Sequence, residues 1–275
     1  MQTAPGVACA GPPRASGAIH RESIEARRRA GDEIWIYNMT AAIEQSPLEH
    51  RLYPWRVLGI DAAGALLWNC CWWYQVNPWE NPTSASYPVG RNQEGLYVYE
   101  AGEASLFYPD PAGEGPLVPA LRLPMIRQGV EDFDIVVELL HEWQEGLDHL
   151  APEARQAAML ADARKALVAP VLLDASSATT SPARTEAVRL LAGNQLEVAR
   201  TRPIVLAYPA RVDTDLAAVG WAEPGTRLTV GGAPVEVDPG GQFTVRLSEE
   251  ELAAGLQWTA EHGAERKQWH WPPLR

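Results

Sequence analysis

The sequence predicts an α/β region with a parallel sheet, followed by a small all-β region. Three observations support this fold class. Helical and strand-like segments alternate in the first part of the chain, an order typical of βα units. Apolar residues recur at helical spacing over long segments in the middle of the chain. Beyond residue 202, short alternating runs are broken by glycine and proline, which is typical of a small β-sandwich.

The first part of the chain alternates helix and strand. Residues 19–30 have helical character and end at a glycine, and the segment 33–38 then alternates briefly and is rich in β-formers. Residues 50–60 again show helical spacing. An apolar run over 65–70 lacks clean alternation, as expected for a strand buried on both faces. We therefore expect the two strands to be parallel neighbours in one sheet.

A long segment rich in proline, glycine and tyrosine follows, from about residue 74 to 118. Within it, residues 96–101 and 105–109 are expected to pair as a hairpin, because loops of this length are usually functional or contain short strands. Residues 118–150 then predict one long helix. Two more helices are expected at 153–169 and 182–200.

The change of sequence texture near residue 202 predicts a domain boundary. We expect a disordered N-terminus over residues 1–17, the α/β region over 18–201 and the β-sandwich over 202–275.

The composition is that of an acidic, folded protein. The chain is 46% hydrophobic and carries a net charge of −12, so it can bury a core but offers no positive surface to nucleic acid or an anionic membrane. No stretch reaches the roughly 18–20 apolar residues of a membrane helix, and residues 1–17 contain no apolar run of signal-peptide length. We therefore expect neither a nucleic-acid nor a membrane partner, and the localisation stays unknown.

Metal and cofactor motifs are not found in the sequence. The cysteines at positions 9, 70 and 71 lack the spacing of a disulfide framework or a thiolate zinc site. We expect Cys70 and Cys71 to be buried, inert thiols. The histidines show no metal-ligand spacing, and no phosphate-binding loop or dinucleotide motif occurs. The sequence thus predicts no metal and no cofactor.

The strongest functional signal is a cluster of tryptophans. Four of the 11 fall within residues 66–79, where the second strand runs out into a loop. Flat aromatic faces pack against the C–H faces of pyranose rings, and an indole N–H can donate to a sugar hydroxyl. This predicts a glycan-binding surface, with a tryptophan-rich core corner as the alternative.

The candidate sugar contacts lie at the ends of the two strands. Trp68 lies inside the apolar run and could equally be core. Trp72 and Trp73 cannot both face one pocket if the backbone is extended there. Glu80 is a possible carboxylate at the mouth of the site, although a solvated loop acid is the simpler interpretation. The predicted substrate-binding residues are Tyr37, Asn38, Trp68, Trp72, Trp73, Asn77 and Trp79.

Three ordered motifs add a family resemblance. They comprise residues 31–37 (GDEIWIY), then 54–55, 60–68 and 77–79, and finally 115–122 (GPLVPALR) with 126–133. In this order, over residues 18–200, they resemble the C-terminal barrel segment of glycoside hydrolase family 123-like proteins, also called domain of unknown function 4091. Asn38 and the two residues after it depart from the Cys- or Gly-containing turn expected in that family.

The resemblance implies a partial (β/α)8 (TIM) barrel, containing C-terminal units only. Known members act on β-linked N-acetylgalactosamine by substrate-assisted hydrolysis, in which the acetamido oxygen of the sugar attacks the anomeric carbon. An adjacent Asp–Glu pair orients the acetamido group and serves as general acid and base. The resemblance implies an amino-sugar-containing glycan as partner and exported full-length relatives.

The catalytic pair of the family is expected on an earlier strand, before Met1. Asp32 and Glu33 precede the first strand, whereas barrel active sites lie at the carboxyl ends of strands. Glu131 and Asp132 lie within a helix, where adjacent side chains diverge. We therefore expect both pairs to be structural, the catalytic residues to be unknown, and an upstream barrel half to be a partner if the protein is split.

The C-terminal pattern over 219–230 and 235–245 resembles bacterial immunoglobulin-like modules appended to glycan-degrading enzymes, which act as spacers or docking surfaces. Three hypotheses follow for the whole chain. It is a C-terminal portion of a glycoside hydrolase that supplies aromatic sugar contacts, a non-catalytic glycan-binding or surface-attachment protein, or a structural scaffold whose tryptophans are all core.

Overall fold

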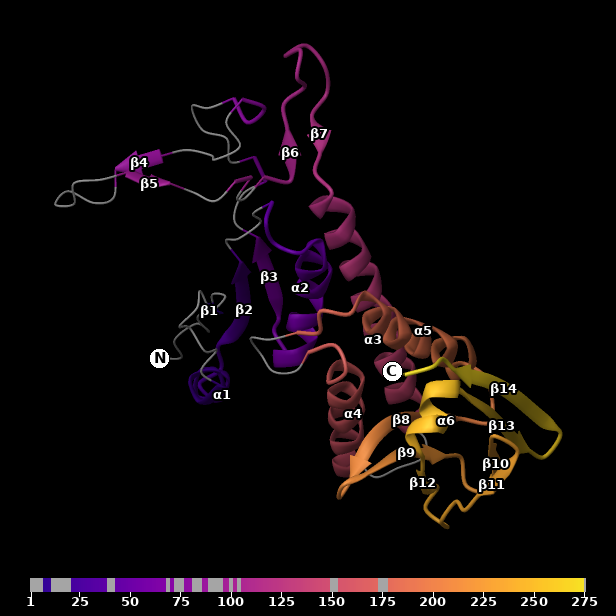
Figure 1. The fold of residues 1–275 in the computed structure, drawn as a ribbon. Helices are drawn as coiled ribbons and strands as arrows, with labels where there is room; N and C mark the ends of the chain where they lie inside the picture. The colour runs from indigo at the N-terminus through magenta and orange to yellow at the C-terminus, as the bar shows by residue number, and fades with distance from the viewer. Residues whose placement is uncertain are drawn as a thin grey trace. The chain divides into compact units, whose positions relative to one another are not determined.

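The computed structural model describes residues 7–10, 21–38, 43–67, 70–71, 77–80, 86–88, 96–98, 101–102, 105–148, 153–172 and 178–274. The chain forms two compact units, and the change from the first to the second falls between Val130 and Glu131. No helix of the described residues is both long and apolar enough to cross a membrane. The first unit contains a parallel sheet and two short antiparallel strand pairs, and the second contains helices and two antiparallel sheets (Figure 1).

The first unit is built on a three-stranded parallel sheet. Its strands are β1 (Val7–Ala10), β2 (Glu33–Asn38) and β3 (Gly64–Leu67), in the order β1-β2-β3. In the register of β2 and β3, Trp35 is opposite Gly64. A Cβ atom at position 64 would lie 2.8 Å from the Trp35 ring, so the indole requires glycine there. The predicted neighbourhood of the two strands is confirmed, with β3 ending at Leu67.

Strand β1 corrects one expectation. Residues 7–10 belong to the segment expected to be disordered, but they pair in parallel with β2 from residue 33 to residue 36. Four small residues give almost no sequence signal for a strand. Their conformation is set by the neighbouring strand, whose backbone groups need partners.

Two helices flank this sheet, α1 (Arg21–Arg29) and α2 (Pro47–Ile60). The Ser46 side chain caps α2 by accepting from the backbone N–H of Leu48, and Pro47 occupies the first turn, so α2 begins three residues before the predicted start. The Tyr53 hydroxyl lies 3.2 Å from the Ile36 carbonyl and 2.7 Å from the Leu66 carbonyl. One side chain thus attaches α2 to two adjacent strands.

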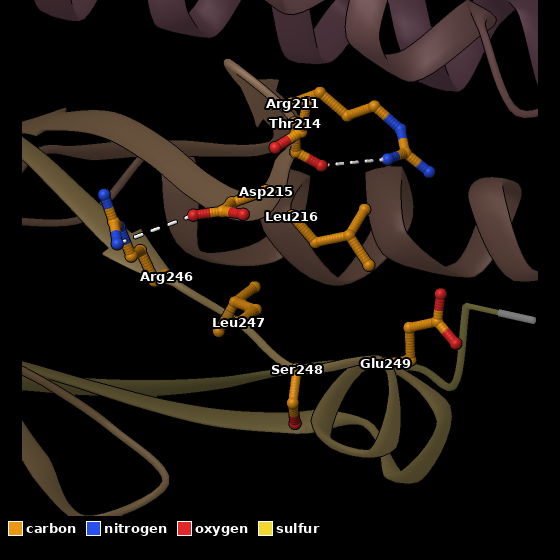
Figure 2. Close-up of a pocket in the computed structure, with 8 residues that line it drawn as sticks. All are labelled: Arg211, Thr214, Asp215, Leu216, Arg246, Leu247, Ser248 and Glu249. Atoms are coloured by element: carbon orange, nitrogen blue, oxygen red, sulfur yellow. Dashed lines mark hydrogen bonds and ion pairs between the residues drawn. The ribbon is translucent and has the colours of Figure 1, made fainter.

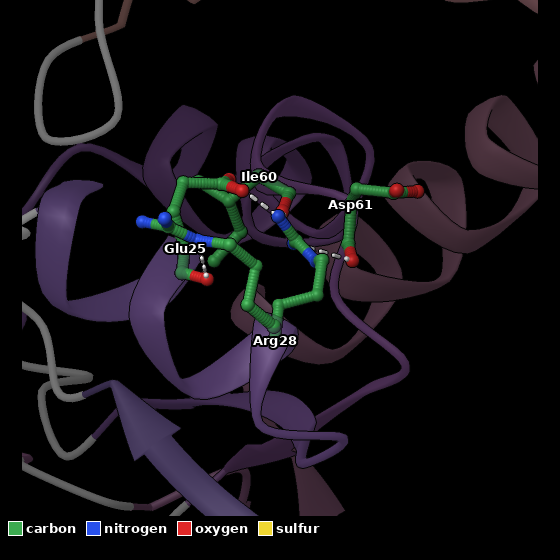
Figure 3. A network of polar contacts seen from close by, with 5 residues as sticks. Glu25, Arg28, Ile60 and Asp61 are labelled. Atoms are coloured by element: carbon green, nitrogen blue, oxygen red, sulfur yellow. Dashed lines mark hydrogen bonds and ion pairs between the residues drawn. The ribbon is translucent and has the colours of Figure 1, made fainter.

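Arg28 joins α1 to the end of α2 (Figure 3). Its Nη2 donates to the carbonyls of Ile60 at 2.6 Å and Asp61 at 3.1 Å, and its Nη1 binds Glu25 at 2.5 Å. Asp61 adopts the left-handed conformation that ends the helix. The last carbonyls of a helix lack intrahelical donors, so a guanidinium there satisfies them and complements the helix dipole.

The strands after β3 pair differently from the prediction. β5 (Leu96–Val98) pairs with β4 (Ser86–Pro88), and β6 (Phe107–Tyr108) pairs with β7 (Val118–Pro119). The predicted hairpin between 96–101 and 105–109 is therefore wrong. Periodicity identifies strand-forming segments but does not select a partner, which depends on contacts distant in sequence. The long helix α3 (Arg122–Asp148) follows, four residues later than predicted.

The second unit contains the end of α3, helices α4 (Glu153–Val168) and α5 (Pro182–Ala199), and two antiparallel sheets. One sheet has the order β12-β9-β8 and the other β11-β10-β13-β14. The short helix α6 (Glu249–Ala254) was not anticipated, nor was β14. The strands are β8 (Val205–Val212), β9 (Asp215–Ala222), β10 (Arg227–Val230), β11 (Ala233–Val235), β12 (Gln242–Arg246), β13 (Leu256–His262) and β14 (Glu265–Trp271). Among the described strands of either unit, the sheets are open and none closes into a barrel.

Tryptophans form the core of the second unit. Trp258 stacks on Trp269 with ring centroids 5.6 Å apart and contacts Trp271 at 5.0 Å. Lys267 reaches from β14 to α5, where its Nζ donates to the carbonyls of Val198 at 2.9 Å and Thr201 at 3.1 Å. The sheet and α5 are therefore joined by packing and by a buried cation that caps the helix.

Candidate functional site

Two described stretches, residues 101–102 and 105–108, form a segment that hydrogen-bonds to the chain just beyond the carboxyl ends of β2 and β3. The Cys70 carbonyl, three residues past the end of β3, accepts from the backbone N–H groups of Leu106 at 2.8 Å and Phe107 at 3.1 Å. The Ile43 N–H, five residues past the end of β2, donates to the Ala101 carbonyl at 2.7 Å. Active sites of parallel sheets and barrels form at this edge. Side chains on or beside the segment are thus placed where a ligand would be expected.

An aromatic pair joins this segment to residues 77–80: Tyr108 of β6 packs against Trp79, and we call the two residues the aromatic shelf. Their ring centroids are 5.5 Å apart and the rings are tilted by 44°. Trp79 is 48% exposed, an unusual state for the largest apolar side chain. Its indole N–H donates to the Pro109 carbonyl at 2.9 Å. The ring is therefore held in place, and its face rather than its N–H is available to a ligand.

The turn before the shelf uses the polar groups of Asn77. Its Oδ1 accepts from the Trp79 backbone N–H at 3.0 Å, and its Nδ2 donates to the Glu80 carboxylate at 3.2 Å. An asparagine that binds the backbone two residues on is a common turn device. Asn77 thus presents Trp79, and its predicted role as a direct sugar contact stays a prediction.

Arg122 holds the Tyr108 side of the shelf in place through hydrogen bonds. This buried guanidinium donates to the Gly102 carbonyl at 3.0 Å and to the Tyr108 hydroxyl at 2.8 Å. Gly102 has φ +66°, and a Cβ there would lie 2.5 Å from the Tyr108 hydroxyl oxygen, so glycine is required by both conformation and space. The arrangement fixes the tyrosine ring on which Trp79 packs.

His50 of α2 is 2% exposed. Burial, and then the positive charge of Arg122, lower the pKa of His50 to about 4. The imidazole is therefore neutral at pH 7. It is buried near the charge of Arg122 and does not act as a cationic ligand group at pH 7.

Of the other predicted sugar contacts, the structure describes Tyr37 fully and Asn38 by its backbone only. Tyr37 is half-buried on β2, opposite Leu66, and burial raises the pKa of its phenol. The backbone of Asn38 ends β2 opposite Leu67. The side chain of Asn38 and the whole of Trp68, Trp72 and Trp73 lie outside the described residues. Of the predicted residues, the structure thus brings Asn77 and Trp79 together and sets Tyr37 on the strand.

Tyr108 and Arg122 were not selected from the sequence. Tyr108 lies in a segment assigned only as a strand, and Arg122 ends one of the three family motifs. Nothing in the sequence indicates that these two residues are in contact, because they come together only when β6 pairs with β7.

One member of each acidic pair forms an ion pair, and the structural role expected for the pairs stays a prediction. Asp32, at the amino end of β2, forms an ion pair with Arg27. Asp132 is buried in the second unit, with a carboxylate oxygen 3.4 Å from the Arg189 guanidinium. No group of three or more potential metal ligands occurs among the described residues.

The second unit has concave surfaces of its own. A cavity of about 430 Å³ lies at the β8–β9 turn (Figure 2). Its polar groups are engaged within the protein: Arg246 lies 3.5 Å from Asp215, Arg211 donates to the Thr214 carbonyl at 3.3 Å, and Ser248 caps α6. This engagement leaves the cavity without a reactive constellation among the residues that line it.

A groove of about 750 Å³ runs between α4 and strands β8 and β9. Most of its lining is alanine, proline, valine and leucine. Burial, and then the charge of Asp162, raise the pKa of Tyr208 to about 12, so its phenol stays protonated. Tyr208 is only 5% exposed, and its ring face is not available for stacking on a sugar.

Comparison with known proteins agrees with the location of the shelf. Residues 7–139 match the family profile described as "Glycoside hydrolase 123, catalytic domain". This segment is similar to the catalytic domain of that family, and the match covers just under half of the chain. The matched range contains β1 to β3, the aromatic shelf and Arg122. The similarity to family 123 therefore lies in the part of the chain that contains the exposed tryptophan.

A solved structure of a family 123 glycoside hydrolase from Clostridium perfringens, described for glycolipid glycan hydrolysis, is 18% identical to this chain with a TM-score of 0.39. The alignment covers 69% of this chain and 31% of that enzyme, so the chain corresponds to less than a third of its length. A search of curated proteins found no match.

Proposed function

We propose that the first unit is the sugar-contacting part of a family 123 glycoside hydrolase, and that the aromatic shelf binds an amino-sugar-containing glycan. The observation that carries this proposal is the 48% exposure of Trp79, packed on Tyr108 at the carboxyl edge of the parallel sheet. Because the indole N–H is engaged by Pro109, affinity would come from the ring face stacking on a pyranose.

The architecture we propose follows from the same unit. The parallel order β1-β2-β3, with α2 between β2 and β3, is that of consecutive βα units. We interpret them as C-terminal units of a (β/α)8 barrel, and the antiparallel sheets of the second unit as an immunoglobulin-like spacer. The buried state of Trp221, Trp258, Trp269 and Trp271 supports a spacer rather than a second aromatic sugar platform.

Substrate-assisted hydrolysis would require an Asp–Glu pair at the carboxyl end of a strand. Asp32 lies at the opposite end of β2, and Asp132 is paired with Arg189 on a helix. These placements favour a second candidate function, glycan binding or surface attachment without catalysis by the described residues.

Calorimetric titration of the chain with N-acetylgalactosamine and with oligosaccharides that contain it tests the first proposal. Trp79→Ala is expected to weaken binding about tenfold, the loss of about 1.4 kcal/mol of stacking energy. Leu190→Ala, which removes another exposed apolar side chain, is the matched control and should bind like the parent. Equal affinity of the parent and Trp79→Ala would rule out the shelf as the binding surface.

Hydrolysis of a nitrophenyl N-acetyl-β-galactosaminide tests whether the chain carries its own catalytic residues. Turnover by the chain would rule out the non-catalytic function. Binding without turnover is expected both of a hydrolase portion that lacks the Asp–Glu pair and of a non-catalytic glycan-binding protein, and recovery of turnover when an upstream barrel half is added would support the hydrolase.

A further inference from the structure

Two adjacent thiols occupy the carboxyl edge of the parallel sheet. Cys70 and Cys71 follow β3 by three and four residues; Cys70 is exposed, Cys71 is half-buried, and neither is in a disulfide. Their side chains lie within hydrogen-bonding reach of each other. The expectation of buried, inert thiols is thus wrong for Cys70. The apolar run is not buried on both faces as expected, because Leu66 on β3 itself is already 52% exposed.

We propose that Cys70 and Cys71 form a vicinal dithiol site that small-molecule disulfides convert to an intramolecular Cys70–Cys71 disulfide, and that this conversion loosens the anchor of β6. We expect the loosened anchor also to change the glycan affinity of the aromatic shelf, and this effect rests on the function proposed above. Low exposure usually makes a cysteine unreactive, whereas an accessible thiol beside a second thiol is the usual arrangement of a redox-active pair.

The conversion is a thiol–disulfide exchange in two steps. The Cys70 thiolate attacks one sulfur of the small disulfide, forming a mixed disulfide and releasing one thiolate. The Cys71 thiolate then attacks the Cys70 sulfur, closing the ring and releasing the second thiolate. The two protein thiols lose two protons and two electrons in total, and the small disulfide gains them as two thiols. Burial, and then Cys70, raise the pKa of the Cys71 thiol, which makes Cys71 the resolving residue.

The ring is expected to be labile. Adjacent Cα atoms are about 3.8 Å apart across a trans peptide, below the roughly 4.4–6.8 Å of ordinary disulfides. Such strain makes a disulfide easier to reduce. The pair would therefore remain dithiol in the presence of excess thiol and close when a disulfide dominates.

Ring closure acts on a backbone that holds the shelf. The Cys70 carbonyl accepts from Leu106 and Phe107, and Phe107 immediately precedes Tyr108 on β6. Closing the eight-membered ring changes the dihedral angles around the peptide bond between the two cysteines. The carbonyl that anchors β6 moves with them, and the shelf with it.

The chemical arm uses the full chain carrying Cys9→Ser, which removes the third cysteine, with Cys70→Ser and Cys71→Ser added singly as matched controls. Oxidised glutathione should remove two hydrogens from the parent mass and leave a stable glutathione adduct on each single-cysteine control. One equivalent of phenylarsine oxide should bind the parent and neither control. A persistent adduct on the parent, without ring closure, would overturn the proposal.

The coupling arm measures hydrogen exchange at the amides of Leu106 and Phe107, which requires no ligand. Exchange should speed up on oxidation and return when dithiothreitol is added; unchanged exchange would overturn the effect on β6. Glycan titration of the reduced and oxidised forms should differ about fivefold, the low end of coupling between two sites. If the reduced form binds no glycan, the function proposed above fails, while the exchange result still decides the dithiol proposal.

Discussion

The tryptophans of the two units lie in opposite environments. Trp258 of the second unit has no exposed surface and touches Trp269 and Trp271, whereas Trp79 of the first unit is 48% exposed and touches Tyr108. Both environments are aromatic, and both rings are held by neighbours. The difference is that the two sheets and helices of the second unit cover Trp258, and nothing in the described part of the chain covers Trp79 to the same extent. A count of tryptophans therefore predicts aromatic packing but not exposure.

The largest expected effect is the loss of stability when the buried Trp258 is truncated. Trp258→Ala should lower the free energy of unfolding of the second unit by about 3–5 kcal/mol, because a fully buried indole leaves a cavity. Urea denaturation followed by circular dichroism measures this loss. Trp79→Ala is the matched exposed substitution and should change the free energy of unfolding by no more than about 0.5 kcal/mol. Equal destabilisation by the two would contradict the contrast between core and surface.

Acid should act on the first unit through His50. Its pKa falls from 6.5 to about 4 on folding. Between these values the unfolded chain binds a proton that the folded chain does not, so stability falls as the pH is lowered through this window. The expected loss reaches about 3 kcal/mol by pH 4, because each tenfold difference in proton affinity between the two states corresponds to about 1.4 kcal/mol.

Urea unfolding at pH 7, 5.5 and 4 measures this dependence in the parent and in His50→Leu, which retains an apolar side chain of similar size. The leucine variant should lose most of the slope between pH 6.5 and 4. An unchanged slope would show that another group titrates.

Raising the pH should stabilise the second unit through Lys267, whereas lowering it destabilises the first unit through His50. Burial lowers the pKa of this ammonium from 10.5 to about 8, although Glu223 opposes the shift. Above pH 8 the folded chain releases a proton that the unfolded chain keeps, so stability should rise with pH between 8 and 10.5, by up to about 3 kcal/mol.

Lys267→Met should flatten this rise, which guanidinium titrations across the window would detect. Lys165→Met removes an exposed lysine from the same unit and serves as the control, which should keep the parent slope. A rise of the same size in Lys267→Met would assign the effect to another group.

The smallest effect concerns the short helix α6. The Ser248 hydroxyl accepts from the Glu251 N–H at 3.1 Å, and the Glu251 carboxylate accepts from the Ser248 N–H at 2.7 Å. Ser248→Ala should cost about 1 kcal/mol of unfolding free energy. The Ser248 backbone N–H, and then its hydroxyl, donate to the Glu251 carboxylate and lower the pKa of Glu251, so this contribution should fade as the pH falls below the ordinary glutamate range. A thermal melt compares it with Glu250→Ala, which leaves the cap intact and should melt like the parent.

Sequence patterns predicted the regular elements of the fold better than their partners. The bounds of β2 agree with the prediction, and α4 and α5 lie within a residue of theirs, because helical and strand periodicities are local properties. β1 was missed, since four small residues become a strand only when β2 supplies hydrogen-bond partners. The 96–101 and 105–109 segments were paired with each other, although their actual partners are β4 and β7.

The candidate site shows the same division. Trp79 was selected as one residue of a dense tryptophan cluster, which is visible in the sequence. Tyr108 and Arg122 were not, because their relation to Trp79 depends on the packing of the Tyr108 ring against Trp79 and on the buried cation that binds the Tyr108 hydroxyl. Asn77 was selected as a ligand contact, and its amide in fact forms the turn that presents Trp79.

The sequence by itself determined the composition of each region: alternating helix and strand in the first part, short β-strands in the last, and indoles concentrated after β3. Those properties follow from side-chain periodicity and intrinsic preference, which act over a few neighbouring residues. Only the tertiary structure decided that Trp258 is covered and Trp79 is not, and that two thiols emerge at the carboxyl edge of the sheet. Exposure depends on which distant segment packs against a side chain, and that choice minimises the free energy of the whole unit rather than of any local stretch.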